Sequence, residues 1–426
     1  MTKLIKYQIL ALILVVNNIS SAQDIKTLQE TFLEAEYFFM SGDYSDALPY
    51  YLKLSEQMPG NANLAYRTGI CYLNIPSEND LAVSYLEKAS SKMSAKHKEG
   101  TVTEESAPYD ALYQLGVSYR ISHQFDKAKE AFSRYRKTLL PDDTVNISFI
   151  DHEIKTCDNA VKMMAIPVKY TLENLGPSIN NERDNFNPVV SPDGNTMIYM
   201  TSLAFYDAIM YTVKTDGKWS EPRNIVPELQ VDEGVFVSSL SEDGRILFLS
   251  QDDNYNSDIY SSELRNGNWS KVVRLNKNIN TKYWESHGFI SEDGKTLVFA
   301  SDRPGGYGGL DIYISRKKNG DWGPAENLGP VINSFLNEDR PSIIENGKTL
   351  FFASQDHNSM GGYDIFRSDL QSSGNWSAPV NLGYPFNDTG DNILFMPEKN
   401  GKAGYISIEG KEDGLGGRDI YHVTFK

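Results

Sequence analysis

Two short segments of the sequence imitate the end of a phosphate-binding loop. Gly294–Thr296 and Gly347–Thr349 both read Gly-Lys-Thr, the order in which a loop lysine and hydroxyl reach nucleotide phosphates. Such a loop also needs a glycine five positions earlier, where Phe289 and Ser342 stand instead. No helical pattern follows either segment, and both coincide with a turn signal. We therefore interpret both as turns and predict no nucleotide site.

The residues that bind metals or act as nucleophiles are few and scattered. No two histidines have the spacing of zinc ligands, and no serine or cysteine lies in a nucleophile motif. The six histidines are His97, His123, His152, His287, His357 and His422. Asp252–Asp258 alternates oxygen side chains as a calcium loop does, but it lacks the central glycine and the later glutamate. A polar loop is the favoured interpretation, with a cation site as the alternative. We predict no metal, no cofactor and no catalytic residue.

Acidic residues offer the one route to catalysis. An aspartate recurs in Asp-Ile-Tyr or Asp-Ile-Phe segments, and a repeated residue favours a structural role, such as bonding turn amides. An active site would single out one or two copies. Asp302, Glu285 and Glu338 could instead serve a glycan or peptide hydrolase through a pair of carboxylates. The enzyme hypothesis is kept as the alternative to a binding protein.

The elements that position these residues belong to a chain of more than one domain. The sequence has 426 residues, is 40% hydrophobic and carries a net charge of −16, with no basic run. This charge excludes a phosphate-backbone footprint, so we expect no nucleic acid partner. Cys71 and Cys157 stand at helical positions among apolar residues, which favours buried free thiols over a disulfide.

The N-terminus has the layout of a secretory signal. Lys3 and Lys6 precede the apolar run 9–16, and small residues end at Ala22. The run is shorter than the roughly 20 residues that span a bilayer. We expect residues 1–22 to be removed on export, with an N-terminal anchor or a buried strand as the alternative. No cysteine lies near the cut, so we expect a periplasmic protein without a lipid anchor and without a later transmembrane segment.

The next part, residues 23–165, repeats with a helical period near 34. Three units share small residues that let paired helices approach and large residues that fill the adjacent space. The small ones are Ala47, Gly69, Ala82, Gly116 and Ala128, and the large ones are Tyr51, Leu86 and Phe132. A helix at about 146–164 could cap the stack. We predict an α-solenoid of about three repeats.

The last part, residues 166–426, repeats with a period near 50. Five Asp-Gly or Asn-Gly turns align, with glycines at Gly194, Gly244, Gly294, Gly347 and Gly401. We expect hairpin turns in which both central residues have positive φ. An apolar run, the Asp-Ile-Tyr segment and a tryptophan follow in order, which is typical of a four-stranded propeller blade. We predict a five-bladed β-propeller; six blades would need a unit that is not found.

The order of these segments also predicts how the ring closes. Asn174–Gly176 matches Asn381–Gly383 but stands before the first turn, whereas the last unit stops after Asp419–Tyr421. The segment around Asn174 should therefore supply the outer strand of the final blade and cover both sheet edges.

These motifs resemble known families. Ser291–Gly306 with Asp311–Tyr313 resembles the PD40 (WD40-like) repeats of exported bacterial propellers, and the helical units resemble tetratricopeptide (TPR) repeats. The order is similar to the front part of the TPR–PD40–OmpA family, without the OmpA-like domain, so we expect no wall-binding domain. The resemblance implies an outer-membrane-associated scaffold that binds envelope proteins, in outer-membrane assembly or in type IX secretion and gliding. Besides the enzyme, a carbohydrate-binding accessory protein is an alternative.

The TPR resemblance also implies where a partner binds. In this family the inner face of the first helix of each repeat commonly holds a peptide. Carried onto this sequence, the inner positions are Phe32, Glu36, Phe39, Asn63, Tyr66, Leu73, Tyr113 and Arg120. These residues would form an aromatic-lined groove for an extended or helical partner segment. The alternative is that the rings pack against neighbouring helices.

Overall fold

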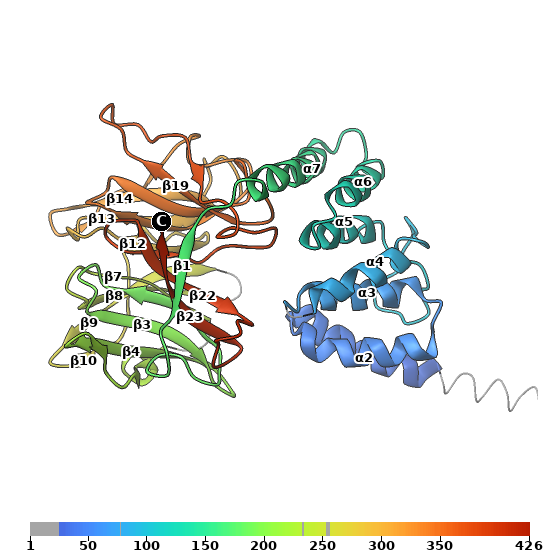
Figure 1. Cartoon of the computed structure of the whole chain (residues 1–426), viewed down its shortest axis with the longest axis horizontal. Helices are drawn as coiled ribbons and strands as arrows, with labels where there is room; N and C mark the ends of the chain where they lie inside the picture. The colour runs from blue at the N-terminus through green and yellow to red at the C-terminus, as the bar shows by residue number, and fades with distance from the viewer. Residues whose placement is uncertain (1–24, 77, 232–233, 253–255) are drawn as a thin grey trace, which may run out of the picture. The chain divides into compact units, whose positions relative to one another are not determined.

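The computed structural model describes residues 25–76, 78–231, 234–252 and 256–426 and divides the chain into two compact units (Figure 1). The first unit ends at Cys157 and the second begins at Asp158, within the helix α7 (Thr144–Met164). The predicted signal segment 1–22 lies outside the described residues, as does part of the candidate calcium loop Asp252–Asp258. No helix of the described part is long and apolar enough to cross a membrane.

The first unit is built of consecutive helices that pair in the predicted order. Residues 25–41 are helical, and this helix is followed by five more helices and one 3-10 turn before α7. The elements are α2 (Tyr44–Gln57), α3 (Ala62–Leu73), η1 (Asn79–Leu81), α4 (Ala82–Ala89), α5 (Ala111–Ile121) and α6 (Phe125–Arg136). Each of the pairs α3–α4 and α5–α6 packs along its length, and α2 packs on α3.

The predicted small residues are where the paired helices touch. A Cβ atom built on Gly116 would lie 2.5 Å from the ring of Phe132, and one on Gly69 would lie 2.7 Å from Cγ of Leu86. Real Cβ atoms do not approach so closely, so only glycine permits these contacts. Cys71 and Cys157 are buried free thiols, as predicted.

The second unit is the predicted five-bladed propeller. Each blade is an antiparallel sheet of four or five strands in which sequence neighbours pair. The first blade contains β2 (Asn185–Val190), β3 (Thr196–Ser202), β4 (Asp207–Thr215), β5 (Lys218–Trp219) and β6 (Arg223–Asn224). The short helix α8 (Val226–Leu229) leads to the second blade, with β7 (Val235–Leu240), β8 (Ile246–Asp252), β9 (Ser257–Arg265), β10 (Asn268–Trp269) and β11 (Val273–Arg274).

The other three blades follow the same order. The third contains β12 (Glu285–Ile290), β13 (Thr296–Ser301), β14 (Asp311–Lys318), β15 (Asp321–Trp322) and β16 (Glu326–Asn327). The fourth contains β17 (Glu338–Ile344), β18 (Thr349–Ser354), β19 (Asp364–Asp369) and β20 (Val380–Asn381). The fifth contains β21 (Met396–Pro397), β22 (Ala403–Glu409) and β23 (Arg418–Phe425), completed by β1 (Tyr170–Asn174). The strands β2, β7, β12, β17 and β21 contact one another around the centre of the ring.

The ring closes as predicted. β1 pairs with β23 from Tyr170↔Phe425 to Asn174↔Tyr421 and forms the outer edge of the last sheet (Figure 1). Asn180 adds to this seam, because its Oδ1 accepts from the Ile420 N–H at 2.9 Å and its Nδ2 donates to the Ile420 carbonyl at 2.9 Å. The two ends of the propeller sequence thereby form one blade and cover both edges.

The prediction that both central residues of the hairpin turns have positive φ is confirmed in the fourth blade, where Asn346 and Gly347 have φ of 55° and 85°, and is wrong in the other four blades. In the first three blades only the glycine has a positive φ, 74° for Gly194 and 68° for Gly294. The aspartate before it instead accepts a hydrogen bond from a serine two residues earlier, as Asp193 does from Ser191. This side-chain bond stabilises the turn while the aspartate stays outside the left-handed region, so one left-handed residue is enough.

Candidate functional site

The eight groove candidates of the helical unit differ in how deeply they are buried. Phe32 is fully buried and contacts Tyr51 edge to face, with ring centroids 6.2 Å apart. Asn63 and Tyr66 are also buried, and the Tyr66 hydroxyl donates to Asp110 at 2.6 Å. The inner positions predicted from the repeat are therefore covered at these three residues by the chain itself.

Charged members of the same set form buried networks. Glu36 accepts from the Tyr51 hydroxyl and pairs with Arg67 at 3.1 Å. Arg120 pairs with Glu153 at 2.5 Å, and both side chains are at most 6% exposed. These ion pairs join neighbouring helices, because a buried charge requires a partner.

Besides Glu36, whose side chain is 14% exposed, three uncharged candidates keep some exposed surface. Phe39, Leu73 and Tyr113 are partly buried, and Tyr113 contacts the rings of Phe132, Tyr135 and Phe149 at 5.8–5.9 Å. Binding of a partner by the eight residues stays a prediction, and the accessible residues among them are these three and Glu36.

A different apolar surface of this unit is exposed. The helix 25–41 presents Ile25, Leu33, Tyr37 and Met40, whose exposed fractions are 49%, 52%, 69% and 79%. Their spacing places them on one face, and Glu30 and Glu34 lie beside them on the same helix. We call Ile25, Leu33, Tyr37 and Met40 the apolar stripe.

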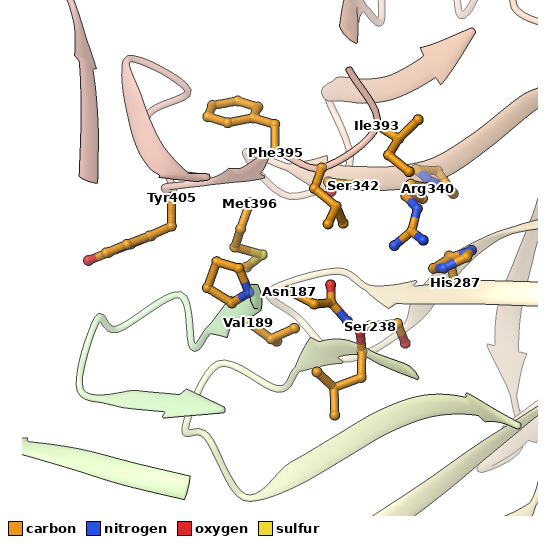
Figure 2. Close-up of a pocket in the computed structure, with 14 residues that line it drawn as sticks. Asn187, Val189, Ser238, His287, Arg340, Ser342, Ile393, Phe395, Met396 and Tyr405 are labelled. Atoms are coloured by element: carbon orange, nitrogen blue, oxygen red, sulfur yellow. Dashed lines mark hydrogen bonds between the residues drawn. The ribbon is translucent and has the colours of Figure 1, made fainter. Parts of the chain in front are cut away.

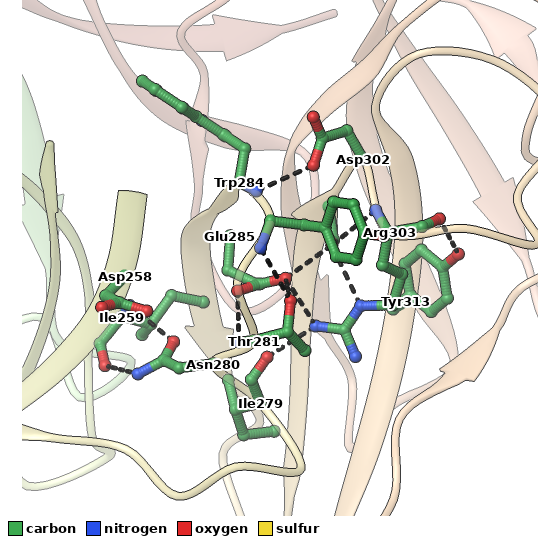
Figure 3. A network of polar contacts seen from close by, with 12 residues as sticks. Asp258, Ile259, Ile279, Asn280, Thr281, Trp284, Glu285, Asp302, Arg303 and Tyr313 are labelled. Atoms are coloured by element: carbon green, nitrogen blue, oxygen red, sulfur yellow. Dashed lines mark hydrogen bonds and ion pairs between the residues drawn. The ribbon is translucent and has the colours of Figure 1, made fainter. Parts of the chain in front are cut away.

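In the propeller, the candidate hydrolytic acids are used to hold loops. Glu285 is fully buried and accepts from the amide and hydroxyl of Thr281, from Ser301 and from Arg303 (Figure 3). Arg303 lies between the rings of Phe299 and Tyr313, 5.0 Å from each centroid. The carboxylate is thus surrounded by donors of its own blade.

Glu338 repeats this arrangement one blade later. It accepts from the amide and hydroxyl of Ser334 and from Ser354 at 2.6–2.7 Å. Burial raises its pKa to about 7, because the three hydrogen bonds that favour the carboxylate do not compensate for its removal from water. Asp302 is exposed and caps the amide of Trp284 at 2.8 Å. None of the three acids lines either of the two propeller cavities described below.

The repeated aspartates of the third and fourth blades have the structural role that the sequence predicts, whereas Asp258 of the second blade pairs with Arg274 at 2.6 Å. Asp311 accepts from the amides of Tyr307 and Gly308 at 2.7 and 3.1 Å, and Asp364 accepts from the amide of Met360 at 2.8 Å. Each also accepts from the asparagine of an Asn-Leu-Gly segment, Asn327 or Asn381. The motif therefore fastens a loop to the outer strand of its own blade.

The centre of the ring contains a polar group that no repeat explains. The residue seven positions before each turn glycine differs from blade to blade, and all five line one cavity (Figure 2). These residues are Asn187, Val237, His287, Arg340 and Leu394. We call this space the channel cavity; its volume is about 40 Å³.

Bulges in the inner strands turn these side chains toward the cavity. The pairing register shifts between Phe186 and Val189, and equivalent shifts occur in β7, β12 and β17. Asn187, His287 and Arg340 have φ of 50°, 52° and 48°, a left-handed conformation that an arginine seldom adopts. A bulge re-aims a side chain and is common beside functional sites.

His287 and Asp339 form a dyad across two blades. His287 Nδ1 lies 3.0 Å from Asp339 Oδ1, which also accepts from the backbone amide of Arg340 at 2.7 Å. Burial, reinforced by Arg340, lowers the pKa of His287, and this exceeds the opposite effect of Asp339. Burial alone would raise the pKa of Asp339, but His287 and Arg340 hold it below its usual range. At neutral pH the pair is therefore a neutral imidazole and a carboxylate, so Nδ1–H donates and the Nε2 lone pair is free of a proton.

A larger cavity adjoins the channel cavity on the side of the turns. It has a volume of about 450 Å³, and Met396 and Tyr405 line both spaces. Its walls are mainly apolar, with Val190, Phe289, Ile290, Ile343 and Ile344 among them. We call it the turn-side cavity. Lys399 lines it and bridges Glu242 at 3.1 Å and Glu292 at 3.8 Å, two acids of other blades.

Sequence reasoning missed the channel cavity, although its signal was present. Counting seven residues back from each turn glycine aligns five positions, and only the third and fourth of them carry an ionisable residue, His287 and Arg340. Asn-Pro, His-Gly and Arg-Pro at three of these positions also mark interrupted strands.

Comparison with known proteins adds a likeness in fold. No family model matches the chain, and no curated protein matches it. Among solved structures, TolB from Acinetobacter baumannii is 18% identical with a TM-score of 0.36, over 65% of this chain and 69% of that chain. The putative TolB from Agrobacterium tumefaciens is 18% identical with a TM-score of 0.36, over 56% of this chain and 74% of that chain. An α-L-arabinofuranosidase from Lactobacillus brevis is 15% identical with a TM-score of 0.39, over 59% of this chain and 92% of that chain. Likeness at this level supports no inference about function.

Proposed function

We propose that the protein is a non-enzymatic scaffold or adaptor of the bacterial cell envelope. It is exported to the periplasm and binds partner proteins through its helical unit and the faces of its propeller. The resemblance to TPR–PD40–OmpA proteins adds association with the outer membrane, and a part in outer-membrane assembly or in type IX secretion and gliding. The N-terminal signal layout supports export.

The apolar stripe is the observation that carries this proposal. Tyr37 and Met40 leave most of their surface in water, and Leu33 leaves about half. Clustered exposed apolar side chains on a folded unit mark interaction surfaces. Glu30 and Glu34 beside the stripe favour a partner segment with apolar residues at helical spacing and basic residues at their flanks.

The test is affinity isolation of the protein from envelope membranes, with identification of the bound proteins. Serine at Tyr37 and Met40 removes apolar surface without touching the core, so the helical unit should keep its thermal unfolding midpoint. Serine at Leu140 and Val145, which are 69% and 75% exposed in the same unit, is the matched control. We expect a partner to be lost from the first variant and kept by the second. Identical sets of bound proteins from both variants would contradict the proposal.

One observation favours the enzyme alternative. In the His287–Asp339 dyad, Nε2 has no hydrogen-bond partner among the described residues, as a general base would require, whereas in the pair His422–Glu398 the Nε2 itself contacts the carboxylate at 2.9 Å. The channel cavity, at about 40 Å³, is smaller than a sugar ring or a peptide unit needs, which favours binding of an end group over hydrolysis. Release of product from envelope glycans or peptides by the purified protein, abolished by His287→Gln, would establish the alternative.

A further inference from the structure

Arg340 places a positive charge in the middle of an acidic protein. Its side chain lines the channel cavity and is turned toward the same space as the ring of His287 (Figure 2). Among the residues that the structure describes, none forms a hydrogen bond or an ion pair with its guanidinium group. Asp339, the adjacent carboxylate, is instead committed through Oδ1 to His287, to Ser286 and to the Arg340 backbone amide.

An arginine in this position is costly without an anion. Burial opposes its charge, and the pKa of Arg340 is lowered as a result even though Asp339 acts in the opposite direction. Arg340 keeps part of its surface exposed, but a guanidinium group that has lost most of its hydration is normally paired with an opposite charge. The left-handed backbone at Arg340 adds strain that a merely structural residue would not need.

A second polar group beside Arg340, the Nε2 atom of His287, also lacks a partner among the described residues. Within the described part of the chain, Nε2 of His287 is buried and has no hydrogen-bond partner. In the neutral imidazole it is an acceptor; after protonation it becomes a donor beside the guanidinium group. The charged groups that act on this ring are Asp339 and Arg340 on β17. Glu285 on its own strand faces Arg303, and Glu338 on β17 accepts from Ser334 and Ser354. The strands β7 and β13 carry no ionisable residue, and those of β8 and β9, which are Asp252, Asp258, Glu263 and Arg265, are not among the groups that act on the ring.

The cavities define the shape of the ligand. The channel cavity accommodates a group of a few atoms, whereas the adjoining turn-side cavity of about 450 Å³ has apolar walls and acids at Asp193, Glu292 and Glu398. An anionic group is repelled at that acidic side and attracted at Arg340. The rest of the ligand would contact the apolar walls.

We propose that the propeller channel binds a carboxylate at Arg340 and His287, with the apolar body that bears this carboxylate in the turn-side cavity. The carboxylate accepts from the guanidinium group, and His287 takes up a proton on binding and donates from Nε2. The shared chemistry is that of an aliphatic carboxylic acid and of the C-terminal end of an apolar peptide. This site does not depend on the proposed scaffold function, because a failure of partner capture leaves it untouched.

Isothermal titration calorimetry on the purified protein tests the site. Hexanoate and hexanamide have the same apolar body and differ in charge, and the tetrapeptide Gly-Leu-Val-Leu with a free or amidated C-terminus makes the same comparison for a chain end. We expect the charged form of at least one pair to bind at least ten-fold more tightly, as loss of a charged hydrogen bond implies. Tighter binding of hexanoate identifies a small acid, and tighter binding of the free peptide identifies a partner terminus. Equal affinity of both forms in both pairs, or no binding by either carboxylate, would overturn the proposal.

Variants and proton uptake complete the test. Arg340→Gln should lose at least ten-fold in affinity, whereas Arg316→Gln, on the exposed part of the neighbouring blade, should bind as the unchanged protein does. Titrations at pH 7 in two buffers of different ionisation enthalpy should show proton uptake that is absent in His287→Gln. Unchanged affinity in Arg340→Gln would refute the role of the guanidinium group. If that variant does not fold, the comparison of charged and neutral ligands on the unchanged protein decides alone.

Discussion

The seam that closes the propeller predicts the effect of Asn180→Ala. Asn180 is 1% exposed, and its amide forms three hydrogen bonds, two to the backbone of Ile420 and one to Asn174. Alanine leaves the buried N–H of Ile420 unpaired, whereas the Ile420 carbonyl keeps the amide of Leu175 as a donor. One unpaired buried donor costs about 2 kcal/mol, and the two other lost bonds add about 1 kcal/mol together. We expect the propeller to lose about 3 kcal/mol in its free energy of unfolding.

Urea unfolding followed by tryptophan fluorescence measures this loss in the propeller alone. All five tryptophans lie between Trp219 and Trp376, within the second unit. Asn333→Ala is the matched comparison, because Asn333 makes the same bonds to Ile312 inside one blade. Asn375→Ala, at an exposed loop position, should change nothing.

The two asparagine variants distinguish a closed ring from an open one. If the seam is formed as described, Asn180→Ala and Asn333→Ala lower stability by similar amounts with unchanged dependence on urea. A loss below about 1 kcal/mol for Asn180→Ala, together with a full loss for Asn333→Ala, would show that β1 does not close the ring.

Three further effects are expected. Gly116→Ala should lower the unfolding free energy of the helical unit by about 1–3 kcal/mol, because the new Cβ would overlap the ring of Phe132. Unfolding followed by circular dichroism measures this loss, and an unchanged unfolding free energy would mean that the two helices can separate without cost. The propeller should lose stability in two steps as the pH falls, below about 6.5 through His287 and below about 4 through Asp339. Both groups have a lower pKa in the folded than in the unfolded chain, so the unfolded chain binds more protons in these pH ranges and is favoured. His287→Gln should remove the first step of that pH profile, and a profile unchanged by this variant would contradict it. Lys399→Glu should lower the thermal midpoint of the propeller by placing a third carboxylate beside the two acids that the lysine bridges, and the decrease should shrink in high salt.

The parts of the fold that repetition specifies could be predicted from the sequence. Five turn glycines fix five blades, and the misplaced Asn174–Gly176 segment fixes the seam, because a circular array has only one way to use an extra outer strand. The roles of Asp311 and Asp364 followed from the same logic, since a residue present in several blades performs a task that every blade needs.

Features that break the repeat could not be predicted in this way. The periodicity places Phe32 and Tyr66 on an inner helix face, but it does not reveal that Tyr51 and Asp110 cover them. The channel cavity depends on strand bulges, which are set by local backbone geometry. Each bulge shifts the pairing register, and the apolar pattern of the strand does not reveal this shift. His287 therefore read as an isolated histidine.

The pairing of β1 with β23 also governs when the propeller can form during synthesis. Tyr170–Asn174 leaves the ribosome long before Arg418–Phe425, its partner strand. The helical repeats that precede it have mainly local contacts and can fold while translation continues. The fifth blade stays incomplete until Arg418–Phe425 emerges, so the chain holds an open sheet edge throughout that interval. A chain of this design gains from a chaperone that covers the edge, and a nonsense mutation before Arg418 would leave β1 without its partner strand, which is encoded about 250 codons downstream.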